Sequence, residues 1–484
     1  MSEQRFHLPM ANATLPVGVV MPYWTFWEAA AGPGLRDDRL AIGRAVVARL
    51  SERGLACSDP LLLASEGEGA ATAEAVGTSG IGALLVVQTM AAPAAHTLAL
   101  LDRQPDVPVV VWAVYRDIGE EADASRITLE GATVGTPMLT AVLARRGRPY
   151  ELVVGPLDDA EPADAVGEAL RAALAATRMR TSRVALVGDP IPGYESVMVD
   201  PEELRAAIGI TIVHSEPGAV AAHGARASTN EIAELSKEVA TDYDIDAALP
   251  AQDLDRTLRL ALGLERLSEE LEADAGAINC HVDTLRRAQD PGITPCFALG
   301  RETSAGRPWT CTGDLLTSVA MLSATSLGQP ALYHEVEYLD ERNGEAILAN
   351  SGEHDLGWLP AGQRPRLLPN AWFRTDPRCG GCAWFPMASG PASLVGFTMA
   401  ADEPSGFRFV VAEGAITERR LDASPSVGGA FRFAGRDGLR ASWRRWARSG
   451  VGHHSAATRG HQARAVSLLA SYLGVGCTVV CEAS

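Results

Sequence analysis

The sequence predicts an α/β protein with two parallel-sheet domains in series, followed by a β-rich, barrel-like domain that ends in a closing helix. Three observations support this prediction. Short β-branched runs alternate with amphipathic helical stretches in the first part of the chain, as in βαβ units. The alternation starts again at Arg183. After Gly328 the strand-like runs are separated by Gly, Pro, Asn and Asp turns, which is typical of antiparallel sheets.

The first domain is predicted to span residues 1–180. The continuous apolar runs Leu84–Val87 and Val109–Trp112 are expected of strands that are buried on both faces. The amphipathic stretch Asp38–Arg53 predicts a helix that Gly54 stops. The other predicted elements are the strands Val17–Met21 and Glu151–Gly155 and the helix Ala165–Met179.

The second domain, residues 181–327, repeats the same alternation and predicts a second parallel sheet. Its predicted strands are Arg183–Gly188, Ile210–His214 and Ala277–Val282, and its predicted helices are Pro201–Ala207, Asn230–Val239 and Gln252–Glu272.

The third domain, residues 328–484, is predicted to be an antiparallel barrel or sandwich. Its strand candidates are Ala331–Leu339, Ala346–Ala349, Ser393–Met399 and Phe407–Ala412. A single closing helix is predicted over Ser455–Leu473, with Gly474 at its C-terminal cap.

Composition and charge argue against several classes of partner. The chain has 484 residues, 47% of them apolar, which is enough for two or three globular domains. No apolar run reaches transmembrane length, and Met1–Met10 lacks the features of a signal peptide. The net charge is −18, without a basic cluster. We therefore expect no nucleic acid and no membrane as partners, and a cytoplasmic location.

The eight cysteines are expected to be reduced thiols. Cys379 and Cys382 have the spacing of a zinc knuckle. A four-ligand zinc site would need a second Cys or His pair close by in the sequence, and none is present. A turn with two incidental thiols is therefore favoured over a metal or redox pair.

Potential metal ligands gather in the last third of the chain. Glu335 and Glu337 alternate along a predicted strand, so both carboxylates are expected on one face. His354 follows a turn, and the pair His453 and His454 precedes the predicted closing helix. Carboxylates and imidazoles together suit a divalent cation such as Mn²⁺, Co²⁺ or Zn²⁺. These residues therefore indicate a metal-assisted reaction.

Each of these residues also has a plainer interpretation. A solvent-exposed, salt-bridged face is the default for the two glutamates, and a polar surface loop is the favoured interpretation of the histidine pair taken by itself. His461 lies seven residues after His454 and would share its helix face as an outer-sphere residue.

The segment Cys311–Asp314 precedes an apolar, helix-like run. Thr312 or Asp314 would cap that helix by accepting hydrogen bonds from its free N–H groups. Capping is the favoured interpretation of this segment taken by itself.

Taken in order, several segments resemble the L-arabinose/L-fucose isomerase superfamily. The resemblance covers nearly the whole chain, and its strength lies in the shared order of the segments. They are Gly131–Leu139, Pro149–Gly155, Arg183–Gly188, Ala277–Cys280, Pro295–Cys296, Cys311–Asp314, Gly328–Glu335 and Gly452–His454.

The resemblance implies that the first two domains are Rossmann-like. It also implies a sugar-like substrate, and a homo-oligomer (trimer or hexamer) whose active site forms where subunits meet. Two acids and one or two histidines would hold a divalent metal, with Mn²⁺ expected first and Co²⁺ or Zn²⁺ as alternatives.

Carried over residue by residue, the resemblance makes Glu335, His354 and His454 the metal ligands. Glu337 is the fallback for the acid, and His453 becomes a neighbouring acid/base or substrate-binding group. Catalytic roles are thereby expected for Glu335 and His453, and contacts to substrate or metal-bound water for Thr312 and Asp314.

Thr312 is where this sequence departs from the family, which has a glutamate there that serves as ligand and proton-transfer group. Aldose–ketose isomerisation needs a positioned base and a cation that stabilises the enediolate charge. A threonine hydroxyl cannot be that base near neutral pH. Three interpretations therefore stay open: a sugar isomerase, a diverged lyase or epimerase on the same scaffold, and a non-catalytic sugar-binding relative.

Overall fold

The computed structural model describes residues 15–32, 34–119, 123–281, 285–286, 291–370, 380–421 and 427–483. The chain divides into two compact units, one formed by Ala13–Arg178 and the other containing Met179–Ser484. The second unit holds both the second parallel sheet and the β-rich region.

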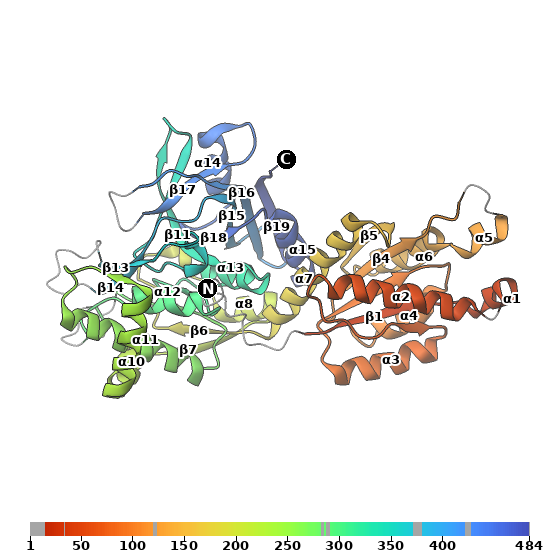
Figure 1. Cartoon of the computed structure of the whole chain (residues 1–484), viewed down its shortest axis with the longest axis horizontal. Coiled ribbons are helices and arrows are strands. Elements are labelled where there is room, and N and C mark those ends of the chain that lie inside the picture. The colour runs from red at the N-terminus through yellow and green to blue at the C-terminus, as the bar shows by residue number, and fades with distance from the viewer. Residues whose placement is uncertain are drawn as a thin grey trace. The chain divides into compact units, whose positions relative to one another are not determined.

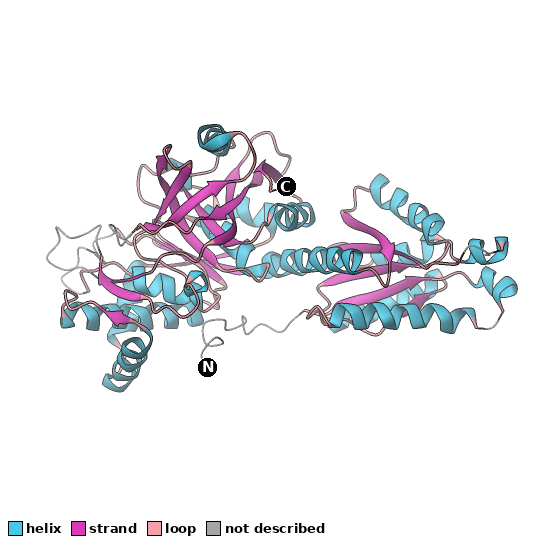
Figure 2. Cartoon of the chain, turned by 45° about the horizontal axis from the view of Figure 1, so that its top comes forward, coloured by secondary structure: helices cyan, strands magenta, loops and turns pink. Residues whose placement is uncertain are grey.

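The N-terminal unit is a five-stranded parallel sheet in the order β2-β1-β3-β4-β5. Helices cover both of its faces (Figure 2). The central strands β3 and β4 are almost completely buried, as their continuous apolar sequences predict. Its strands are β1 (Val17–Pro22), β2 (Leu61–Leu63), β3 (Ala83–Gln88), β4 (Val109–Tyr115) and β5 (Tyr150–Pro156). Its helices are α1 (Glu28–Ala31), α2 (Leu35–Ser51), α3 (Glu66–Ser79), α4 (Ala94–Leu101), α5 (Ala124–Leu129), α6 (Ala132–Arg145) and α7 (Ala160–Thr181).

One stretch of this unit, Ala124–Arg145, is long and apolar enough to cross a membrane when judged by length and composition only. The expectation that no run reaches that length is wrong by this measure. The stretch forms two helices, α5 and α6, which are separated at Gly131. Helix α6 packs against β4 and α4 within the unit.

The second parallel sheet has four strands in the order β10-β9-β6-β7. The strands are β6 (Arg183–Val187), β7 (Thr211–Ser215), β9 (Ala275–Ile278) and β10 (Trp309–Thr310). The helices of this region are α8 (Pro201–Ile208), α9 (Pro217–Ala225), α10 (Thr229–Asp242), α11 (Ala251–Glu270), α12 (Cys296–Ser304) and α13 (Leu315–Ser326). Helix α13 is buried over nearly its whole length.

The β-rich region closes into a barrel (Figure 1). The strands follow the order β15-β18-β11-β12-β17-β16, and β16 pairs back onto β15 along ten residue pairs. The barrel strands are β11 (Ala331–Asp340), β12 (Glu345–Ala349), β15 (Gly390–Met399), β16 (Phe407–Ile416), β17 (Val427–Phe433) and β18 (His454–Arg459). The strand β19 (Gly476–Cys481) adds to β16 in parallel, and the helices are α14 (Gly438–Arg448) and α15 (Ala463–Leu473). The predicted fold class, two parallel-sheet α/β regions followed by a barrel and a closing helix, is therefore confirmed.

A small third sheet joins the central and C-terminal regions. The strand β13 (Arg366–Pro369) pairs with β14 (Gly381–Trp384) and also, in parallel, with the short strand β8 (Asp244–Ile245). Helix α13 packs against β11, β15 and β18 of the barrel. The end of the second sheet and the barrel therefore form one packed body.

The predicted closing helix is wrong over its first part. Residues His454–Arg459 form strand β18, which pairs with β11 on one side and β15 on the other. The helix starts only at Ala463, after Gly460 adopts a positive φ of 75°. Gly474 ends the helix in the left-handed conformation, as predicted.

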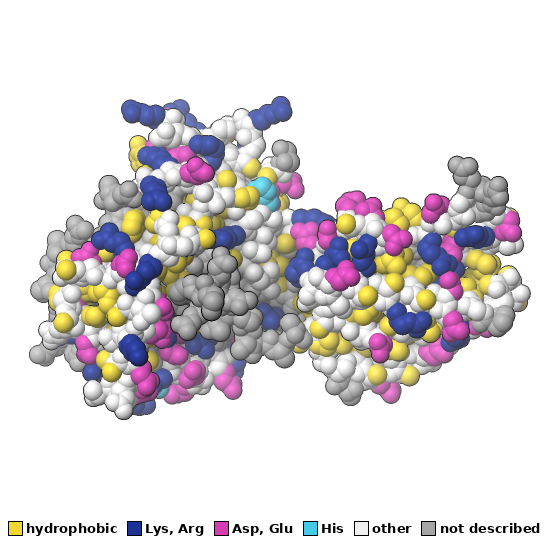
Figure 3. Space-filling view, in the orientation of Figure 1, with side chains coloured by type: hydrophobic (Ala, Val, Ile, Leu, Met, Phe, Trp, Pro, Cys, Tyr) yellow, Lys and Arg dark blue, Asp and Glu magenta, His cyan; other side chains and the backbone are white. Residues whose placement is uncertain are grey.

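Charged side chains of both signs are intermixed on the face of the molecule seen in Figure 3. Many charged side chains of the described residues form ion pairs, such as Arg307 with Glu302 at 2.7 Å and Arg53 with Asp164 at 2.7 Å. On this face the acidic side chains are distributed and do not form a single patch.

Candidate active site

Two neighbouring barrel strands bring an acid and a histidine together. Glu335 of β11 lies directly opposite His454 of β18 in the antiparallel register. The Nε2 atom of His454 lies 3.3 Å from Oε1 of Glu335. The His454 side chain is buried, whereas 38% of the Glu335 side chain is exposed. The pair therefore has one side toward solvent, where a small molecule could approach.

Asp314 holds the other side of the His454 ring. Its Oδ2 lies 2.9 Å from His454 Nδ1. The same carboxylate caps helix α13, since it accepts hydrogen bonds from the backbone N–H and the hydroxyl of Thr317. Both carboxylate oxygens of Asp314 are thus hydrogen-bonded, and the side chain is buried. The predicted helix cap is confirmed, and the carboxylate orients His454 through the ring nitrogen that faces away from Glu335.

These contacts shift the pKa values of the group. Burial lowers the pKa of His454, but its hydrogen bonds with Asp314 and Glu335 outweigh burial and raise the pKa to about 9. Burial raises the pKa of Glu335, and the interaction with His454 more than compensates and lowers it. The protonated His454 ring therefore faces one carboxylate with each of its two N–H groups, Asp314 with Nδ1 and Glu335 with Nε2. A divalent cation between Glu335 and His454 would take the place of the proton on Nε2.

A third ligand atom lies within reach. Glu335, His453 and His454 each offer one ligand atom, and these atoms lie within 4.8 Å of one another. The His453 Nδ1 atom lies 3.2 Å from the hydroxyl of Ser196. Burial, and then the charge of His454, lower the pKa of His453, so its ring is neutral near pH 7. Glu335 and His454 supply a carboxylate and an imidazole, donor types that suit Mn²⁺, Fe²⁺, Co²⁺ or Zn²⁺, and the neutral His453 ring lies beside them.

The carboxylate behind His454 strengthens this fit. Histidines that bind metals usually donate their second ring N–H to a carboxylate, which fixes the tautomer and the ring orientation. Asp314 occupies that position. The residues present therefore fit the divalent cation that the family resemblance implies.

The turn that carries Thr312 is strained. Thr312 has a φ of 62°, one of two positive values among the non-glycine residues that the structure describes. A β-branched residue in this region is a genuine outlier. Gly313 follows with a φ of 76°, and a Cβ atom there would lie 2.8 Å from the Cα of Pro190. The turn is tied to the loop after β6, because Ile191 N–H donates to the Thr312 carbonyl.

Two buried hydroxyls lie at this turn without a hydrogen bond of normal geometry to any described residue. The buried hydroxyls of Thr312 and Tyr333 have no partner in hydrogen-bond geometry within the described part of the chain. They lie close enough that the Thr312 hydroxyl acts to lower the pKa of Tyr333, while burial raises that pKa well above its usual value. The ring of Tyr333 also packs on His454 with the centroids 4.7 Å apart. Buried polar groups without partners are rare and indicate a site for a ligand or water.

His354, a predicted ligand, does not belong to the group around His454. Its ring is buried against Phe385, and within the described residues neither ring nitrogen has a partner. Burial lowers its pKa to about 4. The ring is therefore neutral and unpaired, but it does not share the cluster of Glu335, His453 and His454.

Two further expectations turn out differently. A β-bulge separates Val336 from Tyr338 in the pairing with β12, so the alternation that would put Glu337 beside Glu335 is interrupted there. His461 lies outside the helix, with Nε2 3.2 Å from the carbonyl of Gly414. Asp314, and not His461, contacts the His454 ring.

Several neighbours of the site were not predicted from the sequence. Tyr333 and Ser196 contact His454 and His453, respectively. Glu353 is buried with Oε1 unpaired among the described residues, and burial raises its pKa to about 7. It lies directly before His354 in the sequence, and nothing in the local pattern distinguishes it from a surface acid. Of the predicted Cys379–Cys382 pair, Cys379 lies outside the described residues, and Cys382 is buried.

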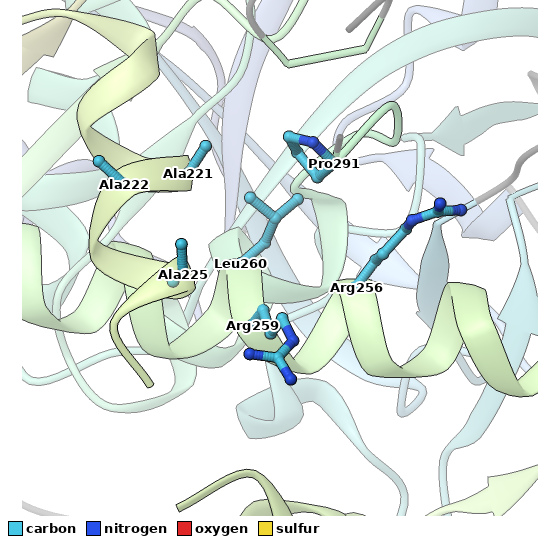
Figure 4. Close-up of a pocket in the computed structure, with 8 residues that line it drawn as sticks. Ala221, Ala222, Ala225, Arg256, Arg259, Leu260 and Pro291 are labelled. Atoms are coloured by element: carbon cyan, nitrogen blue, oxygen red, sulfur yellow. The ribbon is translucent and has the colours of Figure 1, made fainter. Parts of the chain in front are cut away.

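A separate cavity of about 270 Å³ lies between helices α9 and α11 (Figure 4). Its lining is mainly Ala and Leu, with Arg256 and Arg259 at one side. Both arginines are already neutralised, Arg256 by Asp253 at 3.1 Å and Arg259 by Asp255 at 2.8 Å. This cavity lacks the acid and histidine set described above, so the group on the barrel strands is the better candidate for chemistry.

Comparison with known proteins places the chain near one kind of enzyme. No protein-family model matches it. The chain is 22% identical over 332 residues to sulfoquinovose isomerases of Priestia aryabhattai and Priestia megaterium. It is 23% identical over 331 residues to the sulfoquinovose isomerase of Alkalicoccus urumqiensis. The matches cover 63% to 65% of this chain.

The chain is similar to sugar isomerases. It spans 66% to 68% of the length of these relatives. The prediction of an enzyme of this general kind agrees with this similarity. The similarity also agrees with the resemblance to the arabinose and fucose isomerases at the same coarse level.

Proposed function

We propose that this chain is a metal-dependent sugar isomerase that interconverts an aldose and a ketose. The observation that carries the proposal is the cluster of Glu335, His453 and His454, with Asp314 behind His454. The similarity to sulfoquinovose isomerases supports it independently. Sulfoquinovose, the sugar in the names of these relatives, is therefore the first substrate to test.

In this proposal Glu335 and His454 hold the cation, and Asp314 fixes the His454 ring. The bound cation, Mn²⁺ before Co²⁺ or Zn²⁺, would stabilise the negative charge that develops on the sugar oxygens as the proton leaves carbon. The charges of the site support this arrangement. The carboxylates of Asp314 and Glu335 lie on either side of His454 and favour a positive charge between them, which a cation would supply in place of the ring proton.

We assign proton transfer to His453. Glu335 is engaged with His454, Asp314 is saturated by hydrogen bonds, and Thr312 is neutral. The pKa of His453 is lowered by burial, so the neutral ring is available as a base near pH 7. His453→Gln should lower kcat while leaving metal content unchanged. Loss of the metal together with kcat would instead make His453 a third ligand.

Sugar hydroxyls suit the unpaired polar atoms of the site. The hydroxyls of Thr312 and Tyr333 can each donate and accept one further hydrogen bond. A polyhydroxylated substrate would form hydrogen bonds with both side chains. Because a buried hydroxyl without a partner costs free energy, the site should prefer substrates whose hydroxyls are placed to form these bonds.

The test uses the full chain loaded with Mn²⁺ and incubated with sulfoquinovose in D₂O. The proposal predicts a ketose product by NMR, with deuterium incorporated next to the carbonyl carbon. Glu335→Gln and His454→Gln should lose metal and activity together. Glu337→Gln, at the bulge, is the control and should retain both. Metal-loaded protein that neither converts the sugar nor exchanges its protons would contradict the proposal.

Thr312 favours a second candidate, a diverged enzyme that uses the same cation for lyase or epimerase chemistry. Restoring an acid distinguishes the two. If the protein is an isomerase whose activity is lowered by having threonine at position 312, Thr312→Glu should raise isomerase activity on pentoses or 6-deoxyhexoses. Exchange of substrate protons without ketose formation, in both the natural and the substituted protein, would favour the second candidate.

We further propose that the chain is a cytoplasmic homo-oligomer. An aromatic group on the N-terminal unit supports contact with another copy: the rings of Trp24 and Phe26 stack at 4.7 Å, and Phe26 is 60% exposed. Light scattering during gel filtration should give the mass of a trimer or hexamer. A monomeric mass at micromolar concentration would contradict it.

A further inference from the structure

A second group of metal-ligand side chains lies at the end of the central parallel sheet. The strands β9 and β10 pair in parallel, with Gly276 opposite Trp309 and Ala277 opposite Thr310. The residues that follow two neighbouring parallel strands lie at the same edge of the sheet. Cys311 follows β10 directly, and Cys280 follows β9 after one intervening residue. The register therefore explains why these two thiols meet although they lie far apart in the sequence.

The ligand atoms of Cys280, His281 and Cys311 lie within 4.8 Å of one another. Both cysteines are buried and neither forms a disulfide. In a tetrahedral zinc site with Zn–S bonds of about 2.3 Å, two sulfurs lie roughly 3.8 Å apart. The three atoms therefore need only a small inward movement to surround one ion.

Charge in this cluster also favours a cation. The hydrogen bond from Cys311 is the main reason that the pKa of Cys280 falls to about 5, and His281 adds to the effect. The contact with Cys280 in turn raises the pKa of His281. Cys280 therefore has the Cys311 thiol and the His281 ring as direct partners. A dipositive ion held by two thiolates and a neutral imidazole would leave the buried group neutral.

A nearby acid provides an independent sign of an incomplete site. Glu353 is buried, and its Oε1 has no hydrogen-bond partner among the described residues. It lies close enough to Cys280 and His281 for its charge to act on the pKa values of the cluster. A buried, unpaired carboxylate oxygen beside two thiols and an imidazole is a fourth donor of suitable type.

We propose that Cys280, His281 and Cys311 bind a zinc ion that is distinct from the cation at Glu335 and His454. Thiolates are soft ligands and select zinc, whereas the carboxylate and imidazole set accepts harder ions such as Mn²⁺. Zinc would join the ends of β9 and β10 and so hold Thr312, the residue after Cys311, in its strained conformation. Binding through His281 Nε2 places the ring proton on Nδ1, so the Arg286 guanidinium 3.4 Å from Nδ1 must turn away.

The first experiment replaces zinc by Co²⁺ in the full chain. Cobalt bound to thiolates gives an intense charge-transfer absorption in the near ultraviolet, which carboxylate and histidine ligands do not give. We expect this band in the wild-type protein and in Glu335→Gln, and its loss in Cys280→Ser and Cys311→Ser. Cys477→Ser, which changes a thiol of β19 outside the cluster, is the matched control and should keep it. A band unchanged in both cluster variants, or no band in wild type, would overturn the proposal.

A second measurement needs no substitution and therefore does not depend on a variant that folds. Thiol alkylation of the native protein, read by peptide mass spectrometry, should leave Cys280 and Cys311 protected with zinc and labelled after chelation, with roughly one zinc released per chain. Labelling of Cys57 should not change. Equal labelling with and without zinc, or a Cys280–Cys311 disulfide in freshly prepared protein, would overturn the proposal.

Discussion

His454 and Asp314 meet across 140 residues of sequence, with the histidine Nδ1 2.9 Å from the aspartate Oδ2. Two buried elements fix this contact. Helix α13 presents Asp314 as its N-cap, and β18 presents His454 from the barrel wall against which α13 packs. The aspartate therefore has two functions, capping a helix and orienting a histidine, and these can be separated by experiment.

Asp314→Asn makes that separation. Asparagine is as good an N-cap as aspartate, so the free energy of unfolding should change by less than about 1 kcal/mol. Without the negative charge behind His454, Mn²⁺ affinity measured by calorimetry should fall about 10- to 100-fold. Ser228→Asn, at the N-cap of α10, is the control and should not alter affinity. Wild-type affinity in Asp314→Asn would restrict Asp314 to the capping role.

Because the turn is strained, adding one methyl group at Gly313 should markedly lower the free energy of unfolding. In Gly313→Ala the new Cβ would lie 2.8 Å from the Pro190 Cα, at a φ of 76°. We expect a loss of roughly 1–3 kcal/mol in the free energy of unfolding, measured by denaturant titration. In Gly80→Ala, φ is 64° and the added Cβ meets nothing within 4 Å. That control should lose only about 1 kcal/mol. Equal losses would mean that the Pro190 contact relaxes freely.

His334 gives the barrel a pH dependence of known sign. Its ring is fully buried in β11 beside the Ser455 hydroxyl, and burial lowers its pKa from 6.5 to about 4. The unfolded chain therefore binds this proton between pH 6.5 and 4, while the folded chain does not. The neutral His334 ring therefore makes its full contribution to the free energy of unfolding above pH 6.5. This contribution is lost as the pH falls toward 4.

The measurement is the difference in unfolding free energy between the wild type and His334→Gln, taken at pH 7 and pH 5. Between pH 7 and pH 5 the free energy of unfolding should fall more in the wild type than in the variant. The extra loss should be about 1.4 kcal/mol for each pH unit of this interval that lies below the unfolded pKa and above the folded pKa. Identical losses would show that the His334 pKa is not lowered.

Cation binding should raise thermal stability through the same ligands. Mn²⁺ at about 100 times its dissociation constant stabilises a single-site protein by roughly 2.7 kcal/mol. We expect a corresponding rise in Tm for the chelator-treated wild type and none for the Glu335→Gln, His454→Gln double variant. An equal rise in both proteins would place the bound cation elsewhere.

The sequence predicted the two parallel sheets because their signals are local: continuous apolar runs such as Val109–Trp112 and capped amphipathic helices. It failed where long-range pairing decides the structure. Residues after His454 continue an apolar pattern into α15, yet pairing with β11 and β15 makes them a strand. The bulge at Glu337 likewise arises from the partner strand β12.

The candidate site shows the same division. Glu335 and His454 were predicted from residue type and resemblance, and the structure brings them together. Their connection through Asp314 could not be predicted, because it needs the packing of α13 on the barrel. The meeting of Cys280 with Cys311 depends on the pairing of β10, a strand of two residues that has no sequence signature.

The most direct test of the central claim is a crystal structure of the full chain grown with Mn²⁺, with anomalous differences measured near the manganese edge. The account predicts an anomalous peak in contact with Glu335 and the Nε2 atom of His454, with Asp314 still on Nδ1. A fully loaded crystal whose manganese peak touches neither side chain would contradict it.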